Sequence, residues 1–373
     1  MIAMKRNGNL QFLRAKTRQF RLFISMMVSM KILVIRFSSI GDLTQALSIP
    51  SLIKHYHPKA ELHFVTRLDL HTLLENHPHI NHIWTLDRQR GLKGLLSLIQ
   101  QLKKENFTHI YDAHNNVRSL LITLGLSARL SQIPKVLRRP MMRIKRFFLI
   151  RFQINFFEKP FSGQRDLLKP LEKWHMPYFL PSVPQLFLKP ELLSQSLQFL
   201  TQLNSQNYVI IAPSAAYALK RWPLTHWHQL IQNNPQHQFV VLAGPSDHFT
   251  AELNVYKNIL NLTGKTSLHE SAALIAQAQF VISNDTGLLH FAEQLGRPAI
   301  ALMGPAPFGF PSRSSTTILE KNLSCRPCSK HGQGPCKNTH FQACMNLITA
   351  QEVQTVLNQR LSTHPTSVAT TSI

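Results

Sequence analysis

The chain has 373 residues, with 41 Lys and Arg against 18 Asp and Glu, and a formal net charge of +23. A hydrophobic content of 44% and a mean hydropathy of −0.09 are typical of a soluble globular protein and exclude a disordered chain. No run of 18 consecutive apolar residues occurs, which excludes an ordinary transmembrane helix. The charge predicts a polyanionic partner: nucleic acid, an anionic membrane surface or a phosphorylated substrate.

The first 29 residues form a basic segment that ends in a short apolar run at 23–28. It weakly resembles a signal peptide, but no small-residue cleavage site separates it from the apolar stretch that starts at Lys31. We predict a disordered N-terminal extension, or a stretch upstream of a start at Met30; a membrane-surface helix is the alternative. The four Cys all lie within 325–344 and make no secreted disulfide framework, so a cytoplasmic protein is expected.

Predicted strands and helices alternate in two successive runs. In the first run, strands are expected at 31–36, 61–66, 79–86 and 108–114, and helices at 43–56 (kinked at Pro50), 92–104 and 120–130. In the second run, strands are expected at 208–213, 238–243, 280–283 and 298–303. Helices are expected at 224–232, 267–277 and 286–295, and a further helix is expected to follow the strand at 238–243 and to end at Tyr256. Two such runs predict an α/β protein with two doubly wound, Rossmann-like domains.

The predicted domains are 30–185 and 186–350, the second including the Cys-rich segment 325–344, followed by a C-terminal helix and tail at 351–373. Ligands of doubly wound sheets bind beyond the carboxyl ends of the strands. The loops expected to line a cleft between the domains are 37–42, 213–222, 244–248 and 284–290.

The first loop motif, Arg-Phe-Ser-Ser-Ile-Gly-Asp, ends at Asp42. Gly41 permits tight backbone geometry and Ser39 offers a hydrogen-bond donor. Asp42 either points into the cleft or only caps its helix, since Asp is a favoured residue at a helix start. The motif contains no G-x-G-x-x-G pattern, so a dinucleotide fingerprint is absent.

A second motif, Asn-Asp-Thr-Gly-Leu-Leu-His, lies where the strand at 280–283 passes into a helix. Backbone N–H groups and the helix dipole at such a junction favour a phosphate. Asp285 can cap the helix, bind a ribose hydroxyl or align a base. His290 lies one helical turn after Thr286, either as a cleft residue or as a packed core His.

In the loop after the strand at 208–213, Lys220 can neutralise a diphosphate leaving group. Trp222 either stacks on a base or anchors this loop in the core, and the anchor is the favoured interpretation. Between Cys325 and Cys344, a C-x2-C pair is followed by two more Cys, which suggests structural zinc, with packed thiols as the favoured alternative. The four candidate ligands are Cys325, Cys328, Cys336 and Cys344.

The segment 135–159 interleaves basic and apolar residues. This composition suits an anionic membrane face or a lipid phosphate, and it also fits RNA. A plain solvated helix face is the remaining interpretation.

Five motifs in order resemble glycosyltransferase family 9, the ADP-heptose:lipopolysaccharide heptosyltransferases. They are the sequence KILVIRFSSIGD at 31–42, YDAHNNVRS at 111–119, KRWP at 220–223, GKTSL at 264–268 and NDTGLLH at 284–290. The resemblance spans about 31 to 350 and includes the four-Cys segment.

The resemblance implies a GT-B fold and transfer of heptose from ADP-L-glycero-D-manno-heptose to the inner core of lipopolysaccharide, with inversion and without a metal or other cofactor. The N-terminal domain would bind the acceptor and the C-terminal domain the sugar nucleotide, with Asp42 as the catalytic base. The residues expected to bind the donor are Ser214, Lys220, Gly244, Asp247, Asp285, Thr286, Gly287 and His290. The residues expected to bind the acceptor are Ser39, Gly41, Asn116, Arg118, Arg143 and Arg146.

The expected partners are an ADP-sugar, a phosphorylated lipid A-core acceptor and the anionic inner face of the cytoplasmic membrane of a Gram-negative bacterium. A monomer without nucleic acid is expected. The alternatives are a family 9 enzyme with another sugar nucleotide or acceptor, and a basic nucleic-acid-binding protein, which the ordered loop motifs disfavour.

Overall fold

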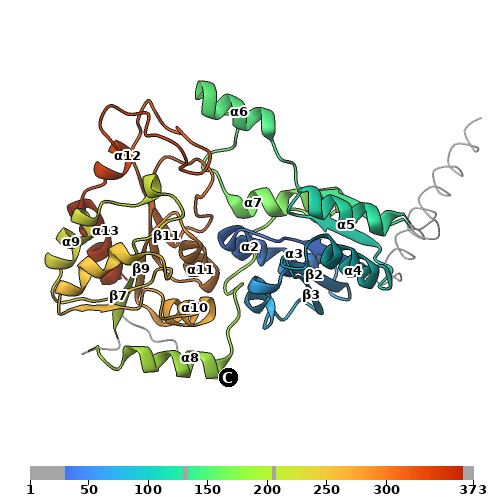
Figure 1. Ribbon diagram of the computed structural model, residues 1–373, viewed down its shortest axis with the longest axis horizontal. Helices are drawn as coiled ribbons and strands as arrows, with labels where there is room; N and C mark the ends of the chain where they lie inside the picture. Colours follow the sequence, from blue (N-terminus) through green and yellow to red (C-terminus); the bar gives the residue numbers. More distant parts are fainter. Residues whose placement is uncertain (1–29, 129–132, 204–206, 364–373) are drawn as a thin grey trace, which may run out of the picture.

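The computed structural model describes residues 30–128, 133–203 and 207–363 (Figure 1). The predicted extension at 1–29 and the last ten residues of the predicted tail lie outside the described residues. Within the described part, the chain forms two parallel β-sheets, each flanked by helices, that lie side by side (Figure 1). The predicted fold class of two doubly wound α/β units is confirmed.

The first sheet has the strand order β3-β2-β1-β4-β5. Its strands are β1 (Lys31–Ile35), β2 (Glu61–Arg67), β3 (His82–Leu86), β4 (His109–Asp112) and β5 (Lys135–Arg138). In the central strand, Ile32 pairs with Leu62 on one side and with His109 on the other. Both faces of β1 are covered by helices, which explains why the strand is an unbroken apolar run.

The second sheet has the order β11-β10-β9-β6-β7-β8. Its strands are β6 (Tyr208–Ala212), β7 (Gln238–Val241), β8 (Ile259–Asn261), β9 (Phe280–Asn284), β10 (Ala299–Met303) and β11 (Thr316–Glu320). In both sheets the strand order reverses direction at the first strand. These reversals place switch points between β1 and β4 and between β6 and β9, where ligands of such sheets bind.

Helices cover both faces of the first sheet. They are α2 (Ile40–Ala46), α3 (Ser48–Tyr56), η1 (Leu68–Leu74), α4 (Gly91–Lys103), α5 (Val117–Ser127), α7 (Gly163–Leu168) and η2 (Lys169–Trp174), whereas α6 (Arg143–Phe152) lies apart from the sheet (Figure 1). The predicted interruption of the helix at 43–56 is confirmed, but the chain forms two separate helices, α2 and α3, that meet at Leu47, and not one kinked helix. Pro50 causes the break, since it has no N–H for the carbonyl of Ala46.

The second sheet is covered in the same way. Its helices are α8 (Pro190–Ser196), η3 (Leu197–Leu200), η4 (Ala218–Lys220), α9 (Leu224–Gln232), η5 (His248–Val255), α10 (Leu268–Gln277), α11 (Gly287–Leu295), α12 (Ala343–Asn346) and α13 (Ala350–Thr363). The helix expected to end at 256 is a 3₁₀-helix, η5, and the predicted C-terminal helix is α13. No helix in the described ranges is long and apolar enough to cross a bilayer.

Two helices, α2 and α11, join the halves of the molecule at the centre of Figure 1. Gly41 and Gly287 allow their backbones to approach, because a Cβ at Gly287 would lie 2.8 Å from the Cγ2 of Ile40. About two turns further along α11, the Gln294 side-chain amide donates to the carbonyl of Thr44 at 2.9 Å. Since each helix starts at a switch point, this contact brings the two ligand-binding ends of the sheets together.

The C-terminal end of α11 packs closely against Val183, and this contact can be tested. Gly296 ends the helix in the left-handed region at φ +74°, and a Cβ there would lie 2.6 Å from the Cγ2 of Val183. We expect Gly296→Ala to lower the free energy of unfolding by about 1–2 kcal/mol, from backbone strain plus this clash. A fall in melting temperature, followed by scanning fluorimetry, measures the effect.

Gly91→Ala is the matched control, because Gly91 also has a positive φ (+54°) but a Cβ there would meet no heavy atom within 4 Å. It should shift the melting temperature less than Gly296→Ala. Equal shifts in the two variants would show that the contact with Val183 contributes nothing.

Candidate active site

A cavity of about 600 Å³ lies where the two switch points face each other. Its walls come from the loops after β1, β4 and β5 in the first half and after β6, β9 and β10 in the second half. The predicted site residues that line it are Ser39, Gly41, Asp42, Arg146, Lys220, Asp285, Thr286, Gly287 and His290. The fold thus brings together residues that lie up to about 250 positions apart in the chain.

Asp42 is both a helix-capping residue and a wall residue of this cavity. Its Oδ2 accepts hydrogen bonds from the Ser39 backbone N–H at 3.3 Å and the Ser39 hydroxyl at 3.1 Å. The same oxygen lies 2.7 Å from Nη2 of Arg36, and the carboxylate side chain remains 42% exposed. The two interpretations left open by the sequence are therefore compatible.

The environment of Asp42 keeps it ionised. Desolvation raises the pKa of the Asp42 carboxyl, but the Arg36 and Arg139 charges and the Ser39 hydrogen bonds outweigh desolvation and hold the pKa at about 2. Asp42 is therefore a carboxylate at every physiological pH and can accept a proton.

Three arginines surround this carboxylate on the side of the first sheet, and only Arg146 was among the predicted site residues. Arg36 is buried and donates from Nη1 to the carbonyl of Ala113 at 2.7 Å. Arg139 donates from Nε to Asp166 at 2.9 Å, and the Arg146 guanidinium lies 4.6 Å from the centre of the Phe308 ring.

Two of these guanidinium groups have an unused donor. Within the described ranges, the Nε atoms of Arg36 and Arg146 are buried without a hydrogen-bond partner. Burial lowers the pKa of both guanidinium groups, yet both remain charged because an arginine pKa starts above 12. Buried cations with spare donors favour an anionic ligand.

On the opposite wall, Lys220 forms an ion pair with Asp285, with Nζ 2.5 Å from Oδ2. Both side chains are largely buried. Gly309 is needed beside them, because a Cβ there would lie 1.9 Å from Oδ1 of Asp285. The cavity is lined by six Lys and Arg side chains against two carboxylates, so a strong positive potential remains after these pairs form.

His290 lines the cavity, but protein groups engage both of its ring nitrogens. Nδ1 lies 3.2 Å from Oε2 of Glu293, and the Gln45 amide lies 3.0 Å from Nε2. A Cβ at Gly41 would lie 2.7 Å from the ring. This geometry favours the interpretation of His290 as a packed residue between the two halves, and its role in donor binding stays a prediction.

The other predicted site residues do not line the cavity. Asn116 caps α5, where its side chain accepts from the Ser119 N–H, and Arg118 and Arg143 are exposed. Asp247 accepts from the Gly244 N–H and pairs with Arg221. Ser214 is half-buried beside the cavity-lining Ala216. Local sequence alone does not distinguish these capping and loop-closing roles from ligand binding.

Sequence reasoning missed several wall residues, namely Arg36, Gln45, Arg67, His114, Asn115, Arg139, Phe308, Gly309, Lys330 and His331. Arg36 carried a usable signal, since a charged residue directly after a buried strand lies at the ligand-binding edge of the sheet. Trp222 is buried and donates to the carbonyl of Ile348 at 2.7 Å, as the anchor interpretation predicts.

The four Cys line one small cavity of about 10 Å³. No three of their sulfur atoms lie within 4.8 Å of one another, whereas sulfur ligands of tetrahedral zinc are about 3.8 Å apart. Burial raises the pKa of the Cys344 thiol to about 11, which favours the protonated form. The arrangement favours packed thiols, and a zinc site here stays a prediction.

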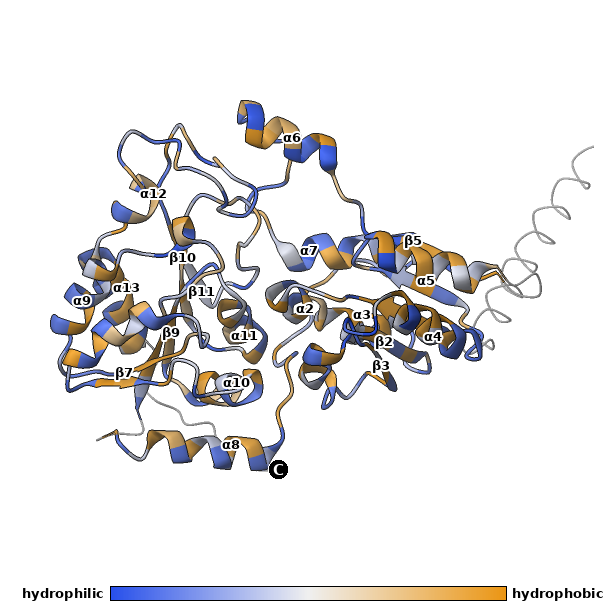
Figure 2. Cartoon of the chain, viewed as in Figure 1, coloured by the Kyte–Doolittle hydropathy of each residue, from blue (hydrophilic) through white to orange (hydrophobic). Residues whose placement is uncertain are grey.

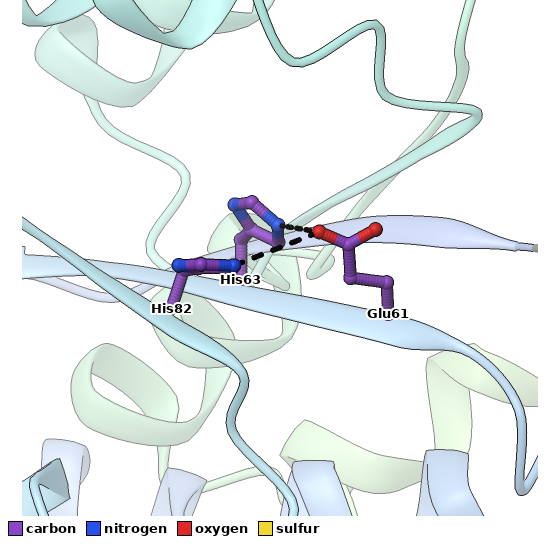
Figure 3. A group of neighbouring side chains, drawn as sticks. All are labelled: Glu61, His63 and His82. Atoms are coloured by element: carbon purple, nitrogen blue, oxygen red, sulfur yellow. Dashed lines mark hydrogen bonds and ion pairs between the residues drawn. The ribbon is translucent and has the colours of Figure 1, made fainter.

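Among the described residues, Glu61, His63 and His82 are the group whose three potential metal-ligating atoms lie within 4.8 Å of one another (Figure 3). Trp84 Nε1–H donates to Nδ1 of His63 at 2.9 Å, so Nε2 of His63 carries the proton and donates to Glu61 at 2.8 Å. A metal on Nε2 would place a proton on Nδ1, facing the Trp84 N–H. The cluster therefore fits a hydrogen-bond network better than a metal site.

The pairing of Arg36 with Asp42 can be tested by carboxyl titration. We expect Arg36→Gln to raise the pKa of Asp42, because the variant removes the main positive charge on that carboxylate. Since the chain has only seven Asp, ¹³C NMR of labelled Asp carboxyls resolves the titration, with Asp42→Asn assigning the signal.

The same change has a consequence for stability. Because the folded pKa is depressed, ionised Asp42 stabilises the wild-type fold above about pH 4 and loses this contribution as the pH falls through 2. In Arg36→Gln this contribution should be smaller, and its loss should be complete at a higher pH, because the folded pKa lies closer to the unfolded one. Arg118→Gln, which removes an exposed arginine outside the cavity, is the control, and an unchanged Asp42 titration in Arg36→Gln would refute the pairing.

Comparisons with known proteins point to one enzyme family. Residues 95–338 match the profile of glycosyltransferase family 9 (heptosyltransferase). The lipopolysaccharide core heptosyltransferase OpsX of Haemophilus influenzae is 27% identical over 294 residues, which cover 72% of this chain and 77% of the relative. The lipooligosaccharide heptosyltransferase 2 of Haemophilus ducreyi is 26% identical over 358 residues, which cover 89% of this chain and 100% of the relative.

The solved structure of Escherichia coli ADP-heptose lps heptosyltransferase II superposes with a TM-score of 0.69 at 24% identity, covering 90% of this chain and 100% of that one. This likeness shows a shared GT-B fold. Because the family profile matches well over half of its residues, the chain belongs to glycosyltransferase family 9 and is a glycosyltransferase.

Proposed function

We propose that this glycosyltransferase transfers heptose from ADP-L-glycero-D-manno-heptose to the inner core of lipopolysaccharide, with inversion and without a required metal. The observation that carries the proposal is the cavity between the two switch points, which Asp42 from the first half and Lys220 from the second half both line. The names of the curated relatives supply the sugar and the acceptor class.

Asp42 acts as the base in this proposal. It removes the proton from the acceptor hydroxyl as the hydroxyl oxygen attacks the anomeric carbon of the heptose. Arg36 and Ser39 fix the orientation of the carboxylate by bonding to Oδ2. The pKa of about 2 makes Asp42 a weak base, so proton transfer occurs late, when the new bond has made the hydroxyl acidic.

The second half of the chain, 186–350, binds the sugar nucleotide. Thr286 and Gly287 lie at the N-terminus of the nine-residue helix α11, where unpaired N–H groups and the helix dipole favour a phosphate. Lys220 lines the same cavity and adds a positive charge, which is paired with Asp285 in this structure. Together these groups neutralise the charge that develops on the departing ADP.

The first half, 30–185, binds a phosphorylated lipid A-core acceptor. The arginines at 36, 139 and 146 lie on the acceptor side of the cavity and exceed what Asp42 and Asp166 neutralise. An anionic sugar or phosphate group on the acceptor provides their counter-charge. Because such an acceptor is lipid-linked, we propose that the enzyme works at the inner face of the cytoplasmic membrane. We also propose that it acts as a monomer and has no nucleic-acid partner.

Direct assay tests the proposal. The acceptors are defined truncated cores, one ending in Kdo and one in heptose, and ADP-heptose competes with UDP- and GDP-sugars as donor. The proposal predicts transfer from ADP-heptose to one of the two cores. If the enzyme prefers another sugar nucleotide, it is still a family 9 glycosyltransferase, but ADP-heptose is not its donor.

Asp42→Asn is expected to lower kcat by about 10²–10⁴-fold, because the amide cannot accept the hydroxyl proton. The Kd for ADP-heptose, measured by calorimetry, should change little. Asp87→Asn is the matched control, since it makes the same chemical change outside the cavity. If Asp42→Asn keeps more than a tenth of wild-type kcat, Asp42 is not the base.

Lys220→Met is expected to weaken ADP binding by about 10–100-fold, the loss that removal of a charged hydrogen bond produces. The weakening should be smaller for AMP, which lacks the second phosphate. Lys265→Met, at an exposed position outside the cavity, is the control. Equal losses for ADP and AMP would contradict a diphosphate contact by Lys220.

A further inference from the structure

Large apolar side chains are exposed in one short stretch around α6. Ile144 is 75% exposed and Phe147 is 58% exposed, although both belong to a helix of only ten residues. The exposed apolar residues of this stretch are Met141, Ile144, Phe147, Phe152, Ile154 and Phe156. Such a concentration on a folded protein marks a binding surface.

The outward face of α6 mixes apolar and basic side chains. Positions 143, 147 and 151 are one helical turn apart and share a face, with Ile144 beside them. Figure 1 shows α6 apart from both sheets, and Figure 2 shows apolar and polar residues alternating along it. We define the docking face as the exposed residues Arg143, Ile144, Lys145, Phe147, Arg151, Phe152, Ile154 and Phe156.

Aromatic contacts hold the apolar part of this surface together. The Phe148 ring lies 5.7 Å from that of Phe152 and 5.8 Å from that of Phe156, and Phe147 contacts Phe152 at 5.8 Å. The rings thus form an ordered patch at the surface. Aromatic rings of this kind are favoured at the boundary between lipid headgroups and acyl chains.

The charge of the stretch has a single sign. From residue 135 to 157 the sequence contains seven Lys and Arg and no Asp or Glu. Positive charge favours an anionic surface, and the exposed aliphatic side chains of Ile144 and Ile154 favour apolar contact. An anionic bilayer offers both at once, whereas the phosphate backbone of a nucleic acid offers nothing to bury isoleucine.

The other side of the same segment forms part of the catalytic cavity. Pro140, Met141 and Arg146 line that cavity. Leu149 and Phe157 line an adjoining cavity of about 780 Å³, which shares Phe161 and Phe308 with the first. A surface that binds to the docking face therefore lies next to the place where the acceptor enters.

We propose that the docking face binds the surface of an anionic phospholipid bilayer. Its aromatic and aliphatic side chains enter the headgroup boundary, and Lys145, Arg151 and Arg143 contact lipid phosphates. This contact holds the mouth of the cavity against the membrane, so that a lipid-linked acceptor reaches Asp42 without leaving the bilayer. The delivery step rests on the proposed function, whereas binding to the bilayer does not.

Vesicle flotation tests the binding. The full chain is mixed with vesicles of phosphatidylethanolamine and phosphatidylglycerol, or of phosphatidylcholine alone, at increasing salt. We expect binding to the anionic vesicles only, and weaker binding as salt screens the charges. Lys145→Gln with Arg151→Gln should lower partitioning roughly 30-fold, and Ile144→Ser with Phe147→Ser about ten-fold.

Matched control variants are available in the second half of the chain. Lys257→Gln with Lys265→Gln removes the same charge from exposed positions, and Val255→Ser with Leu347→Ser removes two exposed apolar side chains. These controls should partition like the wild type. Melting temperatures of all variants show whether each is folded.

A second measurement separates docking from catalysis. Ile144→Ser with Phe147→Ser should lower kcat/KM about ten-fold for an acceptor embedded in anionic vesicles and leave it unchanged for a deacylated, water-soluble core. If no core acceptor is used but the variants still lose vesicle binding, docking stands and the proposed function fails. If the α6 variants partition like the controls, or if the wild type binds RNA in preference to anionic vesicles, the docking proposal is overturned.

Discussion

The close contact between α2 and α11 determines the geometry of this enzyme. The two helices start at the switch points of different sheets, and they approach through Gly41 and Gly287, where a side chain on either would strike His290 or Ile40. Because Asp42 lies in the first turn of α2 and Thr286 caps α11, the same contact fixes the distance between the carboxylate and the phosphate-binding turn.

Opposite charges are paired within each wall of this cavity, and cations remain in excess. Asp42 is neutralised by Arg36 and Asp285 by Lys220, so neither carboxylate repels an anionic substrate. The spare Nε donors of Arg36 and Arg146 then remain for the ligand. An anion bound near Arg36 and Arg139 weakens their field at Asp42 and raises its pKa, which makes the carboxylate a stronger base when the acceptor is present.

The fold could be predicted from the sequence because buried parallel strands are continuous apolar runs, and β1 and β6 are of this kind. Because ligands of such sheets bind beyond the carboxyl ends of the strands, the loops that follow β1 and β6 could be predicted to line the cleft. Arg36 follows a buried strand and could be predicted, but the cluster as a whole could not, because Arg139, which pairs with Asp166, reaches Asp42 only through tertiary contacts. Conversely, Asn116 and Asp247 have the residue types of a binding loop but bond mainly to their own loops.

Among the described residues, the positive charge of the chain is concentrated in two places. Cations line the cavity, and a further group lies on α6, on the opposite side of the same segment from Arg146. A soluble phosphorylated substrate would account for the cavity charges but leaves Ile144 and Phe147 unexplained, since exposed apolar side chains gain nothing from a small anion. A phosphorylated acceptor that remains in an anionic bilayer accounts for both groups, because one segment then contacts the membrane on one side and the acceptor on the other.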